Sequence, residues 1–164
     1  MLESEDNWPP VAVECLPCVL LDHGYRVEAP PLFVKGLSVG DIISVVKDDE
    51  GNISSWEHIS KSKRSTIWLL RTLNSDGIEQ ILQELRSINC NTVQLVEYGC
   101  YSIDVPEKCL IEKVDAQLAR FDPTCVAIAY PSFRHEELTG GGIRGQRING
   151  LSLAPLIQLN ISIL

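Results

Sequence analysis

Basic residues are scarce in this sequence. The chain has 14 Lys and Arg against 22 Asp and Glu, so its net charge is -8 and its pI is near 4.8. A negative field repels phosphate backbones and anionic lipid. Nucleic acid and membrane surfaces are therefore poor partners for this protein. A basic protein or a cationic ligand is the partner that its charge favours.

Long apolar runs are missing too. Charged residues such as Glu14 and Asp22 interrupt the apolar stretches, and none reaches the roughly 18 to 20 residues that span a bilayer. The opening sequence MLESEDNWPP has neither the positive segment nor the apolar segment of a secretory signal. We therefore expect a cytoplasmic protein in which residues 1–8 are disordered.

Histidines are few, and the cysteines lack the spacing of metal ligands. His23, His58 and His135 stand far apart, and Cys15 and Cys18 form a CxxC that has no second pair. A structural zinc site needs four ligands, and a redox-active CxxC normally begins a helix, whereas this one lies in a predicted strand. The other cysteines are scattered, at Cys90, Cys100, Cys109 and Cys125. We predict reduced thiols and no metal site, cofactor or catalytic set.

What the chain does contain is a clear order of periodicities in residues 65–130. Strand-like runs and helical apolar stripes follow one another as strand, helix, strand, strand, helix, strand, over 66–70, 78–88, 93–96, 101–105, 110–121 and 125–130. This βαββαβ order is the signature of a ferredoxin-like sandwich, in which two helices cover one face of an antiparallel sheet. We predict such a subdomain over residues 65–137.

Residues near the helix ends agree with this pattern. Asn74, Ser75 and Asp76 offer side-chain oxygens that can cap the first helix. Asn89 suits a left-handed position at its C-terminal end. Pro106 is predicted to begin the second helix, where proline costs no hydrogen bond.

The N-terminal half is predicted to contain strands and no helix. A first strand runs over residues 11–21, and Tyr25–Glu28 returns as its hairpin partner. Residues 32–46 are typical of strand, glycine-bearing turn and strand, and residues 53–59 form another strand. The predicted fold is therefore α+β, with a small antiparallel β-barrel-like subdomain at 9–64 packed against the ferredoxin-like one. A curled sheet is the alternative form of the N-terminal subdomain.

The last segment, residues 138–164, differs in composition from the rest. It has no acidic residue, two arginines, five glycines and an apolar end without periodicity. We interpret it as an atypical tail that cloning or read-through could have added. A partner-binding arm and a strand added to a sheet edge are the alternatives.

The most distinctive stretch is YRVEAPPLFVKGLSVGDIISV, from Tyr25 to Val45. It resembles the bacterial domain-of-unknown-function family 4265, whose pattern is matched by Tyr25, Pro31, Phe33, Lys35, Gly36, Leu37, Ser38, Gly40 and Asp41. The resemblance covers about residues 8–130. It implies a small bacterial protein without an assigned activity, and it supplies no catalytic residues.

The K-G-x-x-x-G-D element within this stretch is predicted to be a structural turn. Gly36 and Gly40 allow positive φ, and the Asp41 carboxylate can accept a hydrogen bond from the backbone two residues further on. The alternative is that Lys35 and Asp41 are presented to a ligand.

Acidic residues gather at one predicted hairpin tip, Asp48, Asp49 and Glu50, followed by Trp56 and Glu57 in the next strand. With the charge and the missing catalytic motifs, they suggest a non-enzymatic protein-binding module, similar to bacterial immunity proteins that neutralise a toxin by binding it. A small-molecule-binding regulatory domain with a ferredoxin-like sheet is the alternative. A hydrolase or thiol enzyme whose site assembles only in space is a third hypothesis.

Overall fold

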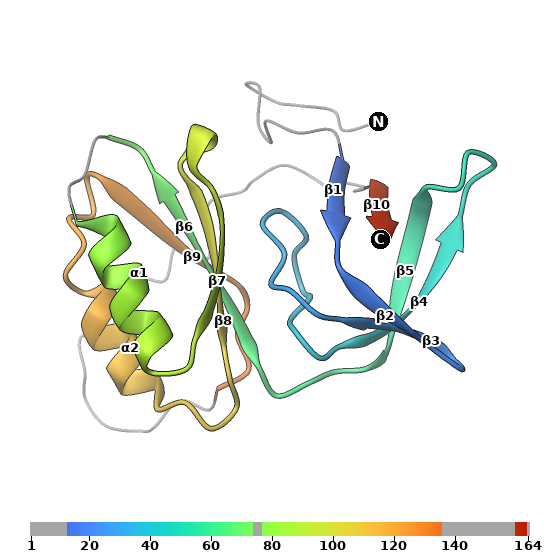
Figure 1. Ribbon diagram of the computed structural model, residues 1–164, viewed down its shortest axis with the longest axis horizontal. Helices are drawn as coiled ribbons and strands as arrows, with labels where there is room; N and C mark the ends of the chain where they lie inside the picture. Colours follow the sequence, from blue (N-terminus) through green and yellow to red (C-terminus); the bar gives the residue numbers. More distant parts are fainter. Residues whose placement is uncertain (1–12, 74–76, 136–159, 164) are drawn as a thin grey trace.

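The computed structural model describes residues 13–73, 77–135 and 160–163. In this part of the chain two β-sheets lie side by side, and two helices cover the second sheet on the side away from the first (Figure 1). The fold class is therefore α+β, as predicted.

The first sheet has six strands in the order β1-β10-β5-β4-β3-β2. Their bounds are β1 Val13–Leu16, β2 Cys18–Leu21, β3 Gly24–Val27, β4 Ile42–Lys47, β5 Ile53–Ser60 and β10 Asn160–Ile163. Neighbouring strands are antiparallel except for the parallel pair β1 and β10. The described strands do not close into a barrel, so the predicted barrel-like form was wrong.

Two local features distinguish this sheet from the predicted strands. Pro17, which has no N–H, divides the predicted first strand into β1 and β2, and these lie at opposite ends of the strand order. The strand expected just after residue 32 is absent from the described structure, because Gly36 and Gly40 take φ values of 82° and 83° and turn the chain.

The second sheet has four antiparallel strands in the order β7-β8-β6-β9. Its elements follow the chain as β6 Ser65–Arg71, α1 Ile78–Ser87, β7 Asn91–Leu95, a 3-10 turn Val96–Tyr98, β8 Cys100–Val105, α2 Ile111–Leu118 and β9 Val126–Ser132. The order of strands and helices along the chain agrees with the predicted one.

The helices bury one apolar stripe each against this sheet. Ile78, Ile81, Leu82 and Leu85 of α1 and Ile111, Val114 and Leu118 of α2 pack with buried strand residues such as Ile67 and Ile103. This spacing of three and four residues is what places the apolar side chains on one helix face.

The predictions for the helix ends had mixed outcomes. Asn89 adopts the predicted left-handed conformation, with a φ of 70°. Pro106 does not begin α2: its carbonyl accepts the amide of Cys109 in a turn at 2.9 Å, and Leu110 is still extended, so the helix starts at Ile111. The predicted caps at 74–76 lie outside the described residues, and Gly77 occupies the N-cap position of α1.

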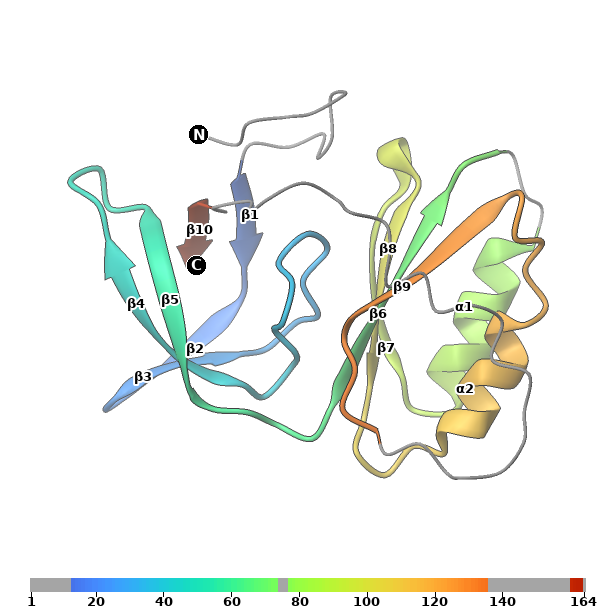
Figure 2. The same cartoon turned by 180° about the vertical axis from the view of Figure 1, so that it is seen from behind.

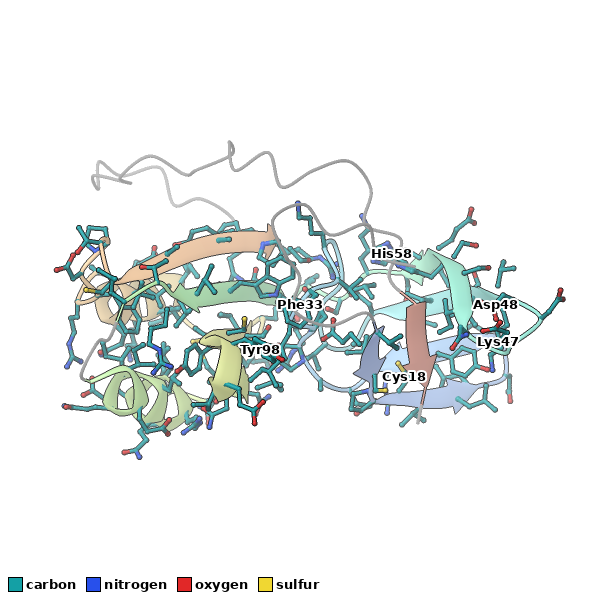
Figure 3. The ribbon with its side chains drawn as sticks, turned by 90° about the horizontal axis from the view of Figure 1, so that it is seen from above. Cys18, Phe33, Lys47, Asp48, His58 and Tyr98 are labelled. Carbon is teal, nitrogen blue, oxygen red and sulfur yellow. The ribbon has the colours of Figure 1, made fainter. Side chains whose placement is uncertain are left out.

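The segment from Pro30 to Gly40 lies between the two sheets and contacts the face of the second sheet that the helices leave free. The Pro31 carbonyl accepts hydrogen bonds from Trp68 Nε1 and Ser102 Oγ, both at 2.7 Å. Phe33, labelled in the middle of Figure 3, is 6% exposed. This segment therefore joins the two sheets through a shared core.

Strand β10 comes from the C-terminal tail. It pairs with β1 along four residues and with β5 at Ile161 and Ile53. Both ends of the described chain thus meet in the first sheet (Figure 2). The tail's other positions, 138–159 and 164, lie outside the described residues, and so do residues 1–8. No helix in the described ranges has both the length and the apolar character needed to cross a membrane.

Candidate functional site

Asp41, the last residue of the K-G-x-x-x-G-D element, is completely buried. Its carboxylate accepts the backbone amides of Ser38 at 3.0 Å and Ser62 at 2.8 Å. The bond to Ser38, three residues earlier, replaces the predicted bond to the backbone two residues later. Gly36 and Gly40 provide the positive φ values that turn the chain around this carboxylate.

Arg134 and His58 complete the environment of Asp41. The Arg134 guanidinium binds both carboxylate oxygens, at 2.5 and 2.7 Å, and His58 Nε2 lies 3.1 Å from Oδ2. We call Asp41, His58, Ser62 and Arg134 the Asp41 cluster. Arg134 follows β9 of the second sheet, whereas Asp41 precedes β4 of the first. The ion pair therefore links the two sheets.

The charge of Asp41 is stabilised despite its burial. Burial raises the pKa of this carboxyl, but the hydrogen bonds from Arg134, Ser62 and Ser38 and the charge of Arg134 outweigh it and hold the pKa below its usual 3.8. A carboxylate with several donors and a bidentate arginine is strongly favoured in its ionised form. Asp41 is therefore a structural anion whose lone pairs are already used.

The Asp41 and His58 pair resembles the orienting half of a catalytic triad, but Asp41 engages Nε2 and not the Nδ1 that the triad aspartate binds. A triad also needs a hydroxyl or thiol bonded to the histidine, and within the described ranges none is found at His58. The guanidinium of Arg134 neutralises Asp41 in addition. The arrangement is suited to holding the sheets in register and to positioning the His58 ring.

A second polar network continues from the cluster into the interior. Ser38 Oγ bonds to Ser132 Oγ at 2.8 Å, and Thr66 Oγ1 donates to Ser38 Oγ at 3.1 Å. Nearby, Ser65 Oγ lies 2.7 Å from His135 Nδ1, but Ser65 is fully buried. No buried side-chain nitrogen or oxygen in the described part of the chain lacks a hydrogen-bond partner. These hydroxyls therefore contribute to packing and are not exposed to a substrate.

The predicted partner-binding residues fall on different surfaces. Asp48, Asp49 and Glu50 are exposed at the β4–β5 turn, far from the second sheet (Figure 3). The Asp48 carboxylate accepts the amides of Glu50 and Asn52 and so shapes this turn. Glu57 is exposed on β5, whereas Trp56 is half-buried on the opposite face of that strand.

Glu57 belongs to an exposed sheet surface, partly aliphatic and partly polar, that sequence reasoning had not identified. Strand alternation directs Ile43 and Val27 inward, where both are fully buried, and directs Val19, Val46 and Ile59 to the other side, where they are 41, 59 and 45% exposed. We call this side, formed by Val19, Arg26, Ser44, Val46, Glu57 and Ile59, the outer face. No helix of the described chain covers it (Figure 1).

The outer face holds one positive and one negative side chain, Arg26 and Glu57, and the acidic turn at its border adds negative charge. Arg26 is its cation, and this side chain is paired with Glu28 at 2.6 Å. Glu57 lies opposite Ser44 in the register, and the acidic turn at 48–50 follows directly after Val46 and Lys47. The surface therefore combines exposed aliphatic side chains with an acidic border.

The two cysteines of the predicted CxxC lie on different strands and differ in exposure. Cys15 is exposed on β1, and Cys18 is half-buried on β2, where burial and then the charge of Glu28 raise the pKa of its thiol to about 11. A thiol with a raised pKa is a poor nucleophile and metal ligand at neutral pH. In the described ranges, no group of three or more His, Cys, Asp and Glu side chains could hold a metal ion.

The family model for a domain of unknown function, DUF4265, matches residues 14–125. The chain belongs to this family. A solved structure, a hypothetical protein from Neisseria gonorrhoeae, is similar with a TM-score of 0.58 and 13% identity, over 77% of this chain and 98% of that chain. At this identity the likeness shows the fold alone. A search of curated proteins found no match.

The DUF4265 match includes Asp41, His58 and Ser62 but ends before Arg134. Sequence reasoning identified Asp41 and missed the rest of its cluster. Arg134 is separated from Asp41 by 93 positions, and no local pattern signals such a pairing. The buried carboxylate of Glu14, which accepts the amides of Leu32 and Phe33, was missed for the same reason. A charged residue inside an alternating strand was the available signal.

Proposed function

We propose that this protein is a non-enzymatic, cytoplasmic protein-binding module that takes a basic protein partner on its outer face. The observation that carries the proposal is that one side of the first sheet exposes three aliphatic residues, Val19, Val46 and Ile59, on the same side as Glu57 and bordered by the acidic 48–50 turn. An immunity protein that covers the basic surface of a cognate toxin is the function class that this combination fits best.

The physical chemistry of association supports this reading. When a partner removes exposed aliphatic side chains from water, the complex is stabilised by about 25 cal/mol for each Å² of apolar surface buried. An acidic border adds long-range attraction for a basic partner and disfavours acidic ones. A net charge of -8 strengthens this attraction at low salt. Apolar contact would thus supply affinity, and charge would raise the association rate and select basic partners.

We also assign the second sheet and its helices to the ferredoxin-like class. The strand order β7-β8-β6-β9, the antiparallel pairing and the βαββαβ chain order support this assignment. The alternative function is a ligand-binding regulatory domain. In the simplest version of this alternative, the ligand binds on the face of the second sheet that is opposite the helices. Here residues from Pro31 to Leu37 pack on that face, through Pro31, Leu37 and their bonds to Trp68, Ser102 and Thr66. This packing favours the protein-binding proposal.

The test begins with capture of partners from the native bacterium at low salt, followed by titration of the purified partner. A variant with Asp49→Lys and Glu57→Lys, called the outer-face variant, reverses one charge in the acidic turn and one on the outer face without touching Asp48, which shapes the turn. A matched control, Glu112→Lys, changes one exposed charge on α2.

We expect the outer-face variant to weaken binding by about tenfold or more and the control to leave it nearly unchanged. Binding by the wild type should also weaken as salt rises. Equal affinities of the outer-face variant and the wild type would contradict the proposal. So would the absence of any stoichiometric partner at low salt.

A further inference from the structure

Lys35, the lysine of the K-G-x-x-x-G-D element, is exposed, in contrast to Asp41 at the other end of the element. The turn and the Asp41 cluster explain the two glycines and the aspartate of this element. They do not involve the lysine side chain. The predicted alternative was that Lys35 and Asp41 both face a ligand. Burial excludes Asp41 from that role, and Lys35 is the residue of the pair that a ligand can reach.

Arg134 brings a second lysine-bearing loop close to Lys35. Its guanidinium donates to the Gly36 carbonyl and to the Ser62 carbonyl, each at 2.9 Å. Lys35 and Lys61 directly precede these two residues, and both lysines are exposed. Because one guanidinium holds both loops, the two flexible lysine side chains start from neighbouring points on the surface.

His58 and Trp56 lie beside the same loops. A Cβ at Gly36 would be 3.9 Å from Trp56 Cη2, so the indole edge borders the Gly36 turn. The His58 ring packs edge-on against Trp56, with 5.0 Å between ring centroids. Asp41 engages Nε2 of His58 and leaves Nδ1 on the other side of the ring. Figure 3 shows His58 on the first sheet, away from the turn that carries Asp48.

The local charge is opposite in sign to that of the whole chain. Among the described residues near these loops, Asp41 is paired with Arg134, Asp104 with Arg64, and Glu107 with Lys63, and Glu57 lies on the opposite face of β5. Lys35 and Lys61 remain as exposed positive charges that no carboxylate of the described residues neutralises. A chain of net charge -8 therefore carries a local positive excess at this point.

We propose that Lys35, Lys61 and His58 form a binding site for a small anionic ligand that carries a carboxylate or a phosphate group. The two ammonium groups supply charge, and the Trp56 edge supplies an apolar wall. His58 Nδ1 supplies a directional hydrogen bond: it donates to the anion when the ring carries both protons, and it accepts from a protonated ligand oxygen when the ring is neutral. This site is separate from the outer face, because Trp56 and His58 point to the opposite side of β5 from Glu57.

The site can be tested by titrating the ¹⁵N-labelled full chain with inorganic phosphate and, separately, with citrate, at constant ionic strength. The observables are the amide resonances of residues 35–36 and 61–62 and the ring resonances of His58. A Lys35→Gln and Lys61→Gln double variant removes the two charges. Lys113→Gln is the control, because Lys113 is an exposed lysine on α2.

We expect saturable shifts at these positions in the wild type and in the control, and an affinity reduced by about tenfold or more in the double variant. Saturation by phosphate but not citrate identifies a phosphorylated ligand class, and the reverse identifies a carboxylate. Shifts that stay linear with concentration for both anions, or that are equal in the double variant, would overturn the proposal. Neither result depends on a protein partner, so failure here is distinguishable from failure of the proposed function.

Discussion

Asp41 shows how one buried side chain can connect two layers of a small protein. Its carboxylate has no exposure, and its partners come from three separate segments: Ser38, Ser62 with His58, and Arg134. Placing a charge in the interior is costly unless hydrogen bonds and an opposite charge compensate. The Asp41 cluster meets that requirement, so the loss of one member should leave the remaining buried charges or hydrogen-bonding groups without a partner.

Asp41→Asn should destabilise the protein by about 2–4 kcal/mol, because it leaves the Arg134 charge partly buried without a counter-ion. The free energy of unfolding in urea measures this effect. The control is Glu107→Gln, the same chemical change in an exposed pair with Lys63. That control should cost less than about 1 kcal/mol. If Asp41→Asn and Glu107→Gln lowered the free energy of unfolding by similar amounts, burial of the Asp41 ion pair would not be the cause of the loss.

The same variant gives a prediction for pH. The folded pKa of Asp41 lies below its usual 3.8, so its ionised form stabilises the protein above that pH. As the pH falls through the folded pKa, the wild type binds a proton and loses this stabilisation. The difference in unfolding free energy between wild type and Asp41→Asn should therefore be largest near neutral pH and shrink below 3.8. Urea unfolding of both proteins from pH 3 to pH 7 would show whether the difference instead stays constant.

Sequence reasoning reached part of this site. Gly36, Gly40 and Asp41 were recognised as a turn because glycine and aspartate have strong local preferences. Arg134 and His58 were not connected with them, because a pairing between distant positions depends on the packing of the two sheets. Trp56 and Glu57 were grouped together as neighbours in sequence, although a strand directs them to opposite faces.

Helices and strands were predicted correctly where the sequence pattern within one segment decides the structure. The helices and strands of residues 65–132 followed from apolar periodicity, which is read within each segment. The start of α2 was misplaced because Pro106 is compatible with a turn as well as with a first helical residue. The strand order of the first sheet was not predicted, and the choice between a barrel and a curled sheet was left open, because both depend on pairings between segments.

The hairpin formed by β2 and β3 depends on a glycine for close packing. A Cβ at Gly24 would lie 2.5 Å from the Ile43 carbonyl oxygen and 2.7 Å from Ile59 Cδ1. Gly24→Ala must therefore push β3 away from β4, and we expect a loss of about 2–3 kcal/mol of stability. Thermal or urea unfolding measures it.

Gly51→Ala is the matched control for that substitution. Gly51 lies in the β4–β5 turn with a φ of 85°, and a Cβ there meets no atom within 4 Å. Its cost should be limited to the left-handed backbone conformation, about 1 kcal/mol. A Gly24→Ala variant no less stable than Gly51→Ala would show that β3 does not approach β4 as closely as described.

At the scale of the whole molecule, the question is whether the two sheets unfold together. The Pro30–Gly40 segment lies between them, and the core of the first sheet includes Cys100 and packs against Leu70 and Leu95 of the second. The Asp41 cluster adds an ionic link. Shared apolar contacts of this kind favour a single cooperative transition over separate unfolding of two domains.

Tryptophan positions allow this cooperativity to be tested. Trp56 lies in β5 of the first sheet and Trp68 in β6 of the second. In a Trp8→Phe background, Trp68→Phe leaves the first reporter and Trp56→Phe leaves the second. In each variant, the urea midpoint from fluorescence should coincide with that from far-UV circular dichroism, which reports the whole chain. Comparison within one variant removes the stability cost of the substitution itself. A fluorescence midpoint that departs from the dichroism midpoint in either variant would mean that one sheet unfolds while the other persists, and the joining segment would then be a linker and not a common core.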